Sequence, residues 1–375
     1  MMATEKVLHM KGGDGETSYT NNSLLQRKVA SMVKPILEDT VKQLTSNFSS
    51  ERCWKVADLG CSSGPNSLFF VSDMLSIMDK ASFSLNQGTP RALQIYMNDL
   101  FGNDFNTIFK LIPDFFQRIH EEKNDKHVRC FIHATPGSFY GRLFSDDYIH
   151  FFHSSYCLHW LSQAPTSTDI AEPLNKGNVY ITNERRPSVY EAYMKQFEKD
   201  FKLFLKSRSE ELRSGGIMLL TFIGREKSQN MTSPWGIIGM VLNDMVQEVT
   251  HEGLVEEAKL DFFDLPIYGP TPEEVRQVIE EEGSFSLKTL EIVKIGWDGN
   301  LQEDVDDAIV DSKTRALIVA KSIRAVFEPL LSAKFGEVIM DEFFFRFAVI
   351  VAQLIDTKFE SLEYTNLIVS MTKDS

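Results

Sequence analysis

The chain has 375 residues, 43% of them hydrophobic, so it can bury a large core in one big domain or two smaller ones. Its formal net charge of −14 argues against nucleic acid as a partner, because phosphate backbones attract basic surfaces. The sequence shows neither a signal-peptide pattern nor an apolar stretch of about eighteen residues, and we expect a cytoplasmic protein without a membrane span. Its 4 cysteines lack C-x-x-C spacing, which favours free thiols over zinc ligation.

The first part of the chain alternates between helical and strand-like patterns. Apolar residues at helical spacing predict an amphipathic helix that starts near residue 24, with the polar cluster from Thr20 to Ser23 as its cap. Helical segments such as 189–212 separate the strand-like runs. These runs lie at 54–59, 93–97, 129–134, 149–154 and 217–223. The alternation predicts an α/β fold with a doubly wound, Rossmann-like sheet.

The pattern changes after Gly224. We expect a helix from Trp235 to Val249, and a capping box with proline at the first helical position in Thr271-Pro272-Glu273-Glu274. Further predicted elements are antiparallel strands at 285–295 and 366–371 and a largely helical stretch at 313–355. We therefore predict an α/β core from residues 1–224, 266–300 and 362–375, with residues 225–265 and 301–361 as a helical cap over the substrate pocket.

A glycine-containing turn follows the first predicted strand. Gly60, Ser62, Ser63 and Gly64 leave room for a ligand beside the backbone, whereas the spacing misses the Gly-x-Gly-x-x-Gly pattern of NAD sites. The next strand ends in Asp99, whose carboxylate can accept hydrogen bonds from both hydroxyls of a ribose. These features suit S-adenosylmethionine. The alternative is an ordinary strand-to-helix turn with Asp99 as a solvated loop acid.

Four further segments join this turn: 10–19, 98–106, 136–144 and 153–162. In their order and spacing they resemble the SABATH family of plant methyltransferases, over nearly the whole chain. That family includes the salicylate, benzoate, jasmonate and indole-acetate carboxyl methyltransferases and the caffeine-type N-methyltransferases. The resemblance implies a methyltransferase sheet with S-adenosylmethionine as cofactor, and we expect a homodimer.

The resemblance also implies a set of residues that line the methyl-donor site. They are Tyr19, Cys61, Asn66, Asp99, Leu100, Ser138 and Phe139. Tyr19 and Phe139 could equally be ordinary core aromatics.

Gln26 lies at helical spacing with Val29 and Val33, so an amide occupies an otherwise apolar stripe and needs a partner when buried. The resemblance implies that Gln26 and Trp160 donate hydrogen bonds to the carboxylate of the substrate. The alternative is that Gln26 bonds to main chain and Trp160 simply packs. Other residues that match pocket-lining positions of the family are Tyr156, His159, Phe222, Trp235, Tyr268, Ile323, Val326 and Tyr364. His159 could also be a structural histidine.

A carboxylic acid with a pKa near ~4 is already ionised at neutral pH, so its methylation needs no general base, and we name no catalytic acid or base. We predict methyl transfer to the carboxylate of a small aromatic acid of the benzoate, salicylate or anthranilate type, by in-line attack with Gln26 and Trp160 orienting the acid. The alternatives are a jasmonate or indole-acetate carboxyl methyltransferase, a caffeine-type xanthine N-methyltransferase, or a sensor of a small acid.

The resemblance further suggests a magnesium site at Asn175, Asp261, Phe263 and Asp264. Oxygen ligands of this kind suit magnesium. Asp264 stands where the family usually has asparagine. The alternative is that these acids are solvated loop residues.

Overall fold

The computed structural model describes residues 7–85, 90–123, 128–165, 172–181, 187–226, 233–247, 254–299, 301 and 310–374. Among the helices of these segments, none has the length and apolar character needed to cross a membrane.

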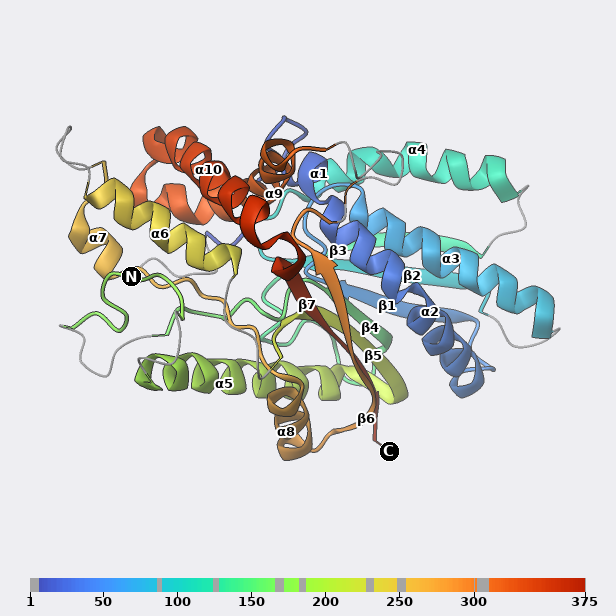
Figure 1. The fold of residues 1–375 in the computed structure, drawn as a ribbon. Helices are drawn as coiled ribbons and strands as arrows, with labels where there is room; N and C mark the ends of the chain where they lie inside the picture. Colours follow the sequence, from blue (N-terminus) through green and yellow to red (C-terminus); the bar gives the residue numbers. More distant parts are fainter. Residues whose placement is uncertain are drawn as a thin grey trace.

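A seven-stranded mixed sheet forms the centre of the molecule, with the strand order β3-β2-β1-β4-β5-β7-β6 (Figure 1). Five strands run parallel: β1 (Cys53–Leu59), β2 (Ala92–Asp99), β3 (Arg129–Pro136), β4 (Ile149–Ser155) and β5 (Leu212–Gly224). At one edge, β7 (Glu363–Lys373) pairs antiparallel with both β5 and β6 (Phe285–Gly296). The predicted α/β sheet and its antiparallel pair are therefore confirmed.

Helices cover both faces of the sheet, as doubly wound folds require. One side carries α2 (Leu24–Asn47), α3 (Asn66–Leu85) and α4 (Phe105–Lys123), and the other carries α5 (Pro187–Glu211) and α8 (Pro272–Glu282) (Figure 1). Buried apolar residues such as Val29, Val33 and Leu37 line the inner stripe of α2. The amphipathic helix expected from residue 24 is therefore confirmed.

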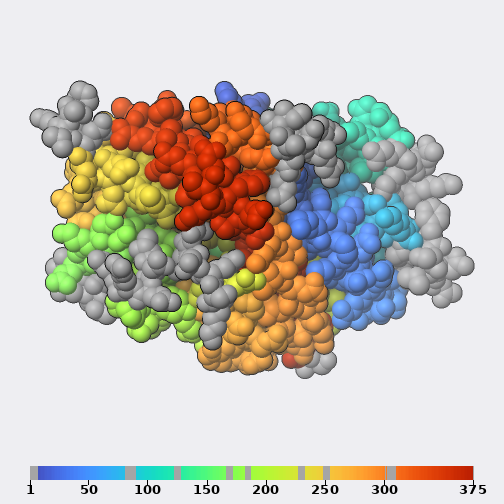
Figure 2. All heavy atoms as spheres, in the orientation of Figure 1, coloured from blue at the N-terminus to red at the C-terminus, as the bar shows by residue number. Residues whose placement is uncertain are grey.

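A second group of helices packs together beside the sheet: α6 (Pro234–Val246), α7 (Glu257–Asp261), α9 (Ser312–Phe335) and α10 (Met340–Lys358). Figure 2 shows α10 in red beside α6 in yellow on the molecular surface. The short 3-10 helices η3 (Glu337–Ile339) and η4 (Phe359–Ser361) flank α10. These helices lie in the segments predicted as a helical cap, whose boundaries stay a prediction. The last residues expected for the helix at 235–249 lie outside the described residues.

The two predicted helix caps have different outcomes. The capping box before α8 is confirmed, because Thr271 Oγ1 accepts from Glu274 N at 3.2 Å and Glu274 Oε2 accepts from Thr271 N at 2.9 Å. The cap predicted at Thr20–Ser23 is wrong. Residues 19–22 form their own helical turn, α1 (Tyr19–Asn22), and Ser23 makes no side-chain cap bond to α2. Its Oγ instead accepts from Asn66 Nδ2 of α3 at 2.9 Å.

A fully buried ion pair at the end of α5 fixes the loop after β3. Arg208 Nε donates to Glu211 Oε2 at 2.8 Å, and both side chains are buried from solvent. Arg208 also donates to the carbonyl oxygens of Phe139 (2.7 Å) and Gly141 (2.8 Å), and Glu211 Oε1 accepts from Phe144 N at 2.9 Å. The pair therefore clamps residues 139–144 through the backbone.

We expect Glu211→Ala to destabilise the protein strongly, because removal of one partner leaves Arg208 buried with an uncompensated charge. The expected loss is about 3–5 kcal/mol in the free energy of unfolding, measured by denaturant titration. Glu281→Ala, which breaks an exposed pair with Lys202, is the control and should change that free energy far less. Equal effects of the two substitutions would contradict the clamp.

Candidate functional site

The turn after β1 packs tightly against the chain itself. Gly60 has φ +78°, and a Cβ there would lie 2.1 Å from Cys157 Sγ, in the turn after β4. Gly64 has φ +99°, and its Cβ would lie 2.8 Å from Thr20 Oγ1 of α1. Both positions thus require glycine for conformation and for space. The sequence predicts a turn whose small residues leave room for a ligand, with an ordinary strand-to-helix turn as the alternative; the nearest neighbours of Gly60 and Gly64 in the structure are protein atoms.

Asn98, at the end of β2, holds two turns at the carboxyl edge of the sheet. Its backbone oxygen accepts from Gly60 N and Cys61 N, both at 2.8 Å. Its Nδ2 donates to Thr135 O at 2.7 Å and to Gly137 O at 2.9 Å. The buried amide therefore fixes the turns after β1 and β3 relative to β2.

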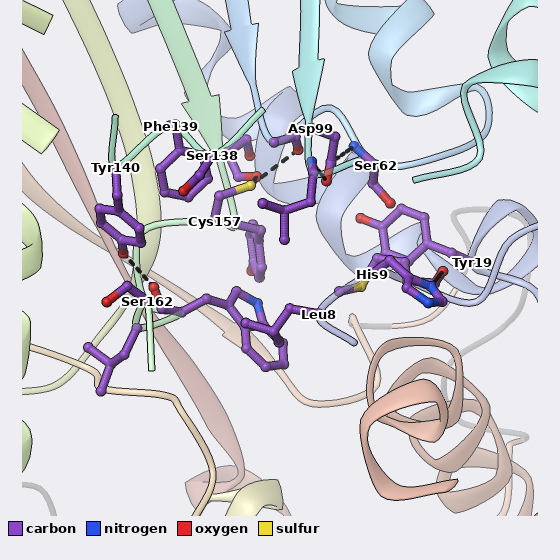
Figure 3. A pocket seen from close by; sticks show the side chains of 17 residues that line it. Leu8, His9, Tyr19, Ser62, Asp99, Ser138, Phe139, Tyr140, Cys157 and Ser162 are labelled. Atoms are coloured by element: carbon purple, nitrogen blue, oxygen red, sulfur yellow. Dashed lines mark hydrogen bonds between the residues drawn. The ribbon is translucent and has the colours of Figure 1, made fainter. Parts of the chain in front are cut away.

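A first cavity opens at this edge of the sheet (Figure 3). Five residues predicted for the methyl-donor site line it: Tyr19, Asp99, Leu100, Ser138 and Phe139. The segment 8–10, with His9 and Met10, closes another side. Tyr140 also lines this cavity and was not predicted, although it lies in one of the recognised segments; its hydroxyl donates to Trp160 O at 2.5 Å.

Asp99 is the acid of the first cavity. Its Oδ2 accepts from Ser62 N and its Oδ1 from Leu100 N, both at 2.7 Å (Figure 3). Burial raises the pKa of the Asp99 carboxyl to about 6, against the opposing effect of these two hydrogen bonds. A carboxylate has about four lone-pair sites, so each oxygen of Asp99 keeps the capacity to accept a further hydroxyl hydrogen.

A second cavity of about 250 Å³ adjoins the first between α2 and α3, and the two share Tyr19, Gly60 and Ser155 as lining residues. The other two residues predicted for the donor site, Cys61 and Asn66, line this second cavity. The predicted donor-site residues are thus divided between two adjoining cavities.

A third cavity lies between the loop after β4, α2 and the helices α6 and α9. Eight of the residues predicted for the substrate line it: Gln26, Tyr156, His159, Trp160, Trp235, Ile323, Val326 and Tyr364. The third cavity shares Met10, Tyr19, Tyr156 and Trp160 with the first, so the two meet at these side chains.

Phe222 and Tyr268 line none of these three cavities. Phe222 is fully buried on the other face of β5, where its ring lies 6.2 Å from that of Phe201 in α5, because successive side chains of a strand point to opposite faces. Tyr268 is also fully buried, and its hydroxyl donates to Glu274 Oε2 at 3.0 Å. In this structure both are packing residues.

Gln26 and Trp160, the two residues predicted to orient the substrate, each have a hydrogen-bonding group without a protein partner among the described residues. Gln26 Oε1 is buried without one. Trp160 is held by a bridge to Ile267 and by packing of its ring 5.3 Å from that of Phe327, and no hydrogen bond occupies its indole N–H within the described segments. Both groups are available to a ligand.

His159 is a neutral member of the third cavity. Its Nδ1 accepts from Ile223 N at 3.4 Å, and its ring stacks on Trp235 with centroids 6.2 Å apart. Burial lowers the pKa of His159 to about 3, so the ring carries no charge at neutral pH. Among the described residues that line this cavity there is no acid, lysine or arginine.

Tyr156 sits where the first and third cavities meet, in a left-handed backbone conformation with φ +63°. Bulky residues rarely adopt it, and such strain persists only where the surroundings enforce it. Here Tyr156 N donates to Thr221 O at 2.7 Å, which ties the turn to β5.

Of the residues predicted to bind magnesium, Asn175 and Asp264 are hydrogen-bonded neighbours. The Asn175 amide donates to Asp264, and its Nδ2 also donates to Tyr180 O at 2.8 Å. Asn175 thus presents its NH₂ group to the carboxylate, where a shared cation would require the amide oxygen. Burial raises the pKa of Asp264 to about 7.

The other two predicted ligands are also engaged within the protein. Asp261 Oδ1 accepts from Gly177 N at 3.0 Å, and its Oδ2 lies 3.6 Å from Lys176 Nζ. Phe263 packs its ring 5.0 Å from that of Phe335. The described residues contain no cluster of three or more histidine, cysteine, aspartate or glutamate side chains that could hold a metal. These groups do not fit a magnesium site as they are arranged here, and magnesium binding stays a prediction.

A sequence model of the family described as SAM dependent carboxyl methyltransferase matches residues 5–374. The chain belongs to this family. It is 42% identical over 384 residues to the probable caffeine synthase MTL2 of Coffea canephora, covering 99% of this chain and 98% of that protein. It is also 42% identical over 383 residues to the probable jasmonic acid carboxyl methyltransferase 2 of Theobroma cacao, covering 99% of this chain and 100% of that protein.

The fold of this methyltransferase matches a solved structure, loganic acid methyltransferase with SAH, with a TM-score of 0.82 and 27% sequence identity. The match covers 98% of this chain and 99% of that one. The SABATH resemblance, the methyltransferase fold and S-adenosylmethionine as cofactor are therefore confirmed. The first two cavities fit this cofactor. They combine Asp99, which can accept hydrogen bonds from the two ribose hydroxyls, with the aromatic ring of Phe139 and a turn of small residues. Which residues hold it stays a prediction.

We expect the affinity for S-adenosylhomocysteine to decrease as the pH is lowered below about 6. The raised pKa of Asp99 means that its carboxylate is replaced by the neutral acid as the pH falls through about 6, and the neutral acid accepts hydrogen bonds less well. Calorimetric titration should show a Kd about tenfold weaker at pH 5 than at pH 7.5. Asp99→Asn should bind weakly at both pH values and lose this dependence; an unchanged wild-type Kd across the range would contradict the assignment.

Proposed function

We propose that this methyltransferase acts on a carboxylate oxygen and converts a small aromatic acid of the benzoate, salicylate or anthranilate type to its methyl ester. The observation that carries the proposal is the pair of donors in the third cavity. The Gln26 amide and the Trp160 indole N–H line the same cavity, neither donor has a hydrogen bond to the protein within the described residues, and Gln26 Oε1 is buried without a partner. Two neutral N–H donors can orient a carboxylate group.

The charge of the third cavity supports the same substrate class. None of the described residues that line it is cationic, and His159 is neutral because burial lowers its pKa to about 3. An arginine in this place would stabilise the carboxylate more before the reaction than during it, since the negative charge is lost in the transition state. Neutral donors fix the direction of the acid and leave its nucleophilicity largely intact.

When bound, S-adenosylmethionine supplies a methyl group on a positively charged sulfur, which an ionised carboxylate can attack without a base. The residues of this chain then contribute orientation and exclusion of water. Trp160 and Tyr156 line both the first and the third cavity, and both residues are themselves buried. No described residue of the third cavity is required to move a proton.

Gln26 Oε1 favours some acids over others. It is a buried acceptor without a partner among the described residues, and such a group costs roughly 1–3 kcal/mol when it stays unpaired. An acid with an O–H or N–H group next to its carboxylate could donate to this oxygen. Salicylate and anthranilate have such a group and benzoate does not, so we expect the first two to be preferred.

A xanthine is the second candidate substrate, because its ring N–H could also donate to Gln26 Oε1 and because proteins named caffeine synthase are as similar to this chain as those named for jasmonic acid. Methylation of a ring nitrogen requires loss of its proton. His159, with a pKa of about 3, is a poor base for that step. A carboxylate needs no such step, which is the reason for our preference.

Jasmonate and indole-acetate remain within the proposed class of carboxylate acceptors. Membership of a methyltransferase family supports an enzyme over a sensor of a small acid. The expected homodimer and the cytoplasmic location stay predictions.

The purified protein should transfer a labelled methyl group from S-adenosylmethionine to aromatic acids. The panel contains benzoate, salicylate, anthranilate, jasmonate, indole-acetate, xanthine and 7-methylxanthine at matched concentrations, with mass spectrometry of the products. We expect methyl esters, with anthranilate and salicylate ahead of benzoate. Label in xanthines alone would refute carboxyl methylation.

Gln26→Ala should lower kcat/KM for the acid roughly ten- to a hundredfold, because one hydrogen bond to a charged group is lost. Gln26 lines both the second and the third cavity, so titration with S-adenosylhomocysteine is the companion measurement. Its Kd should change little if Gln26 serves the acceptor. Loss of that binding with intact acid turnover would place Gln26 on the donor side instead.

Trp160→Phe should also lower kcat/KM for the acid, since the ring packing is largely kept and the indole donor is lost. Neither this variant nor Gln26→Ala should show a new ionisation between pH 6.5 and 9 in its rate profile, because no titrating group is removed. Ser322→Ala, which removes a hydroxyl from the α9 wall of the same cavity, is the control and should change the rate much less. A new pH-dependent step in Trp160→Phe would contradict a purely orienting role.

A further inference from the structure

A partly buried histidine and a buried aspartate face each other across β1 and β4, outside the predicted set of site residues. Asp58 and His153 are paired in the parallel register of these strands, and His153 Nδ1 lies 2.7 Å from Asp58 Oδ1. The side chains are 7% and 12% exposed respectively, so the pair is nearly closed to solvent. The ring of Phe70 in α3 stacks on the imidazole at 4.1 Å with an interplanar angle of 8°.

This pair lines the second cavity, close to its junction with the first. Gly60 and Ser155 belong to both cavities, and each lies two residues beyond a member of the pair. The charge of Asp58 contributes to the raised pKa of Asp99, so the two carboxylates interact across the junction. A cationic group that enters the junction would relieve their repulsion.

Among the carboxylates that line the two cavities, Asp58 is the one available for a cation. Each oxygen of Asp99 already accepts a backbone N–H group, and its remaining capacity suits the two hydroxyls of a ribose. Asp73 is paired with Lys34 Nζ at 2.5 Å. Within the described part of the chain, the hydrogen bond to Asp58 comes from His153.

We propose that His153 is a positioning residue, which holds the Asp58 carboxylate in place to receive the α-ammonium group of the methyl donor. The cofactor carries an amino-acid part, and burial of its ammonium group without a counter-charge is costly. The imidazole takes one carboxylate oxygen and so fixes the plane of the Asp58 side chain, which leaves the other oxygen for the ammonium. Phe70 and the strand register in turn fix the imidazole. This inference uses the cofactor alone and does not depend on which acceptor is methylated.

Ligands that differ in the amino-acid part test the proposal. S-adenosylhomocysteine carries this part and 5′-methylthioadenosine lacks it, so the ratio of their Kd values isolates it. His153→Phe keeps an aromatic ring against Phe70 and removes the hydrogen bond. We expect its Kd for S-adenosylhomocysteine to rise about tenfold, with the Kd for 5′-methylthioadenosine unchanged. Asp58→Asn should also raise the Kd for S-adenosylhomocysteine selectively, and by a larger factor than His153→Phe.

Two further variants separate positioning from general damage. His153→Asn retains an N–H donor near the place of Nδ1 and should restore most of the affinity for S-adenosylhomocysteine. His150→Phe replaces the other histidine of β4, which is buried, accepts from Lys55 N at 3.1 Å and lines none of the three cavities, and should leave the ratio of the two Kd values unchanged.

The proposal is overturned if His153→Phe weakens both ligands equally, or leaves both unchanged. If His153→Phe fails to fold, Asp58→Asn decides by the same ratio. These binding measurements need no acceptor, so a failure here is distinct from a failure of the proposed acid substrate.

Discussion

The close approach of two turns at Gly60 is the constraint on which the candidate site depends. The turn after β1 has no side chain at this position, and Cys157 of the turn after β4 fills the space. Tyr156, Cys157 and Trp160 line the first cavity together with Gly60 and Asp99 at the carboxyl ends of β1 and β2, and the first and third cavities share a wall. Because the strands are parallel, their carboxyl ends share one edge of the sheet and bring these turns together.

The site is divided electrostatically as well as spatially. Two aspartates, Asp58 and Asp99, lie beside the cavities that fit the cofactor, and among the described residues no charged side chain lines the third cavity. A positively charged donor is favoured on the first side. The carboxylate acceptor that we propose for the second side would be oriented by neutral groups, and its charge would remain available for bond formation. The buried Arg208–Glu211 pair fixes a wall of the first cavity through backbone oxygens and so adds little charge to it.

Local sequence patterns predicted the helices and strands well. They predicted less well which side chains pair across distant parts of the chain. The strands and the capping box at Thr271 follow from residue types a few positions apart. The polar cluster from Thr20 to Ser23 predicts a cap for α2, but the Ser23 hydroxyl accepts a hydrogen bond from Asn66, 43 residues away. No local pattern reveals such a partner. Phe222 could have been excluded by strand alternation, since Thr221 and Ile223 line the cavities and Phe222 must face away. The pairing of Asp58 with His153, 95 residues apart, depends on strand register and so emerged only from the structure.

The wall of the third cavity formed by α6 and α9 has an evolutionary consequence. Trp235, Ile323 and Val326 come from helices that contribute no residue to the first two cavities. Substitutions on these helices can therefore change the shape of the third cavity without changing the residues that line the two cavities that fit the cofactor. A lineage built on this scaffold can diversify its substrates through a few helix positions while the sheet edge stays constant. The relatives named for caffeine and for jasmonic acid have the same sequence identity to this chain, 42%. Such a pair of relatives is expected when substrates change through these helices alone.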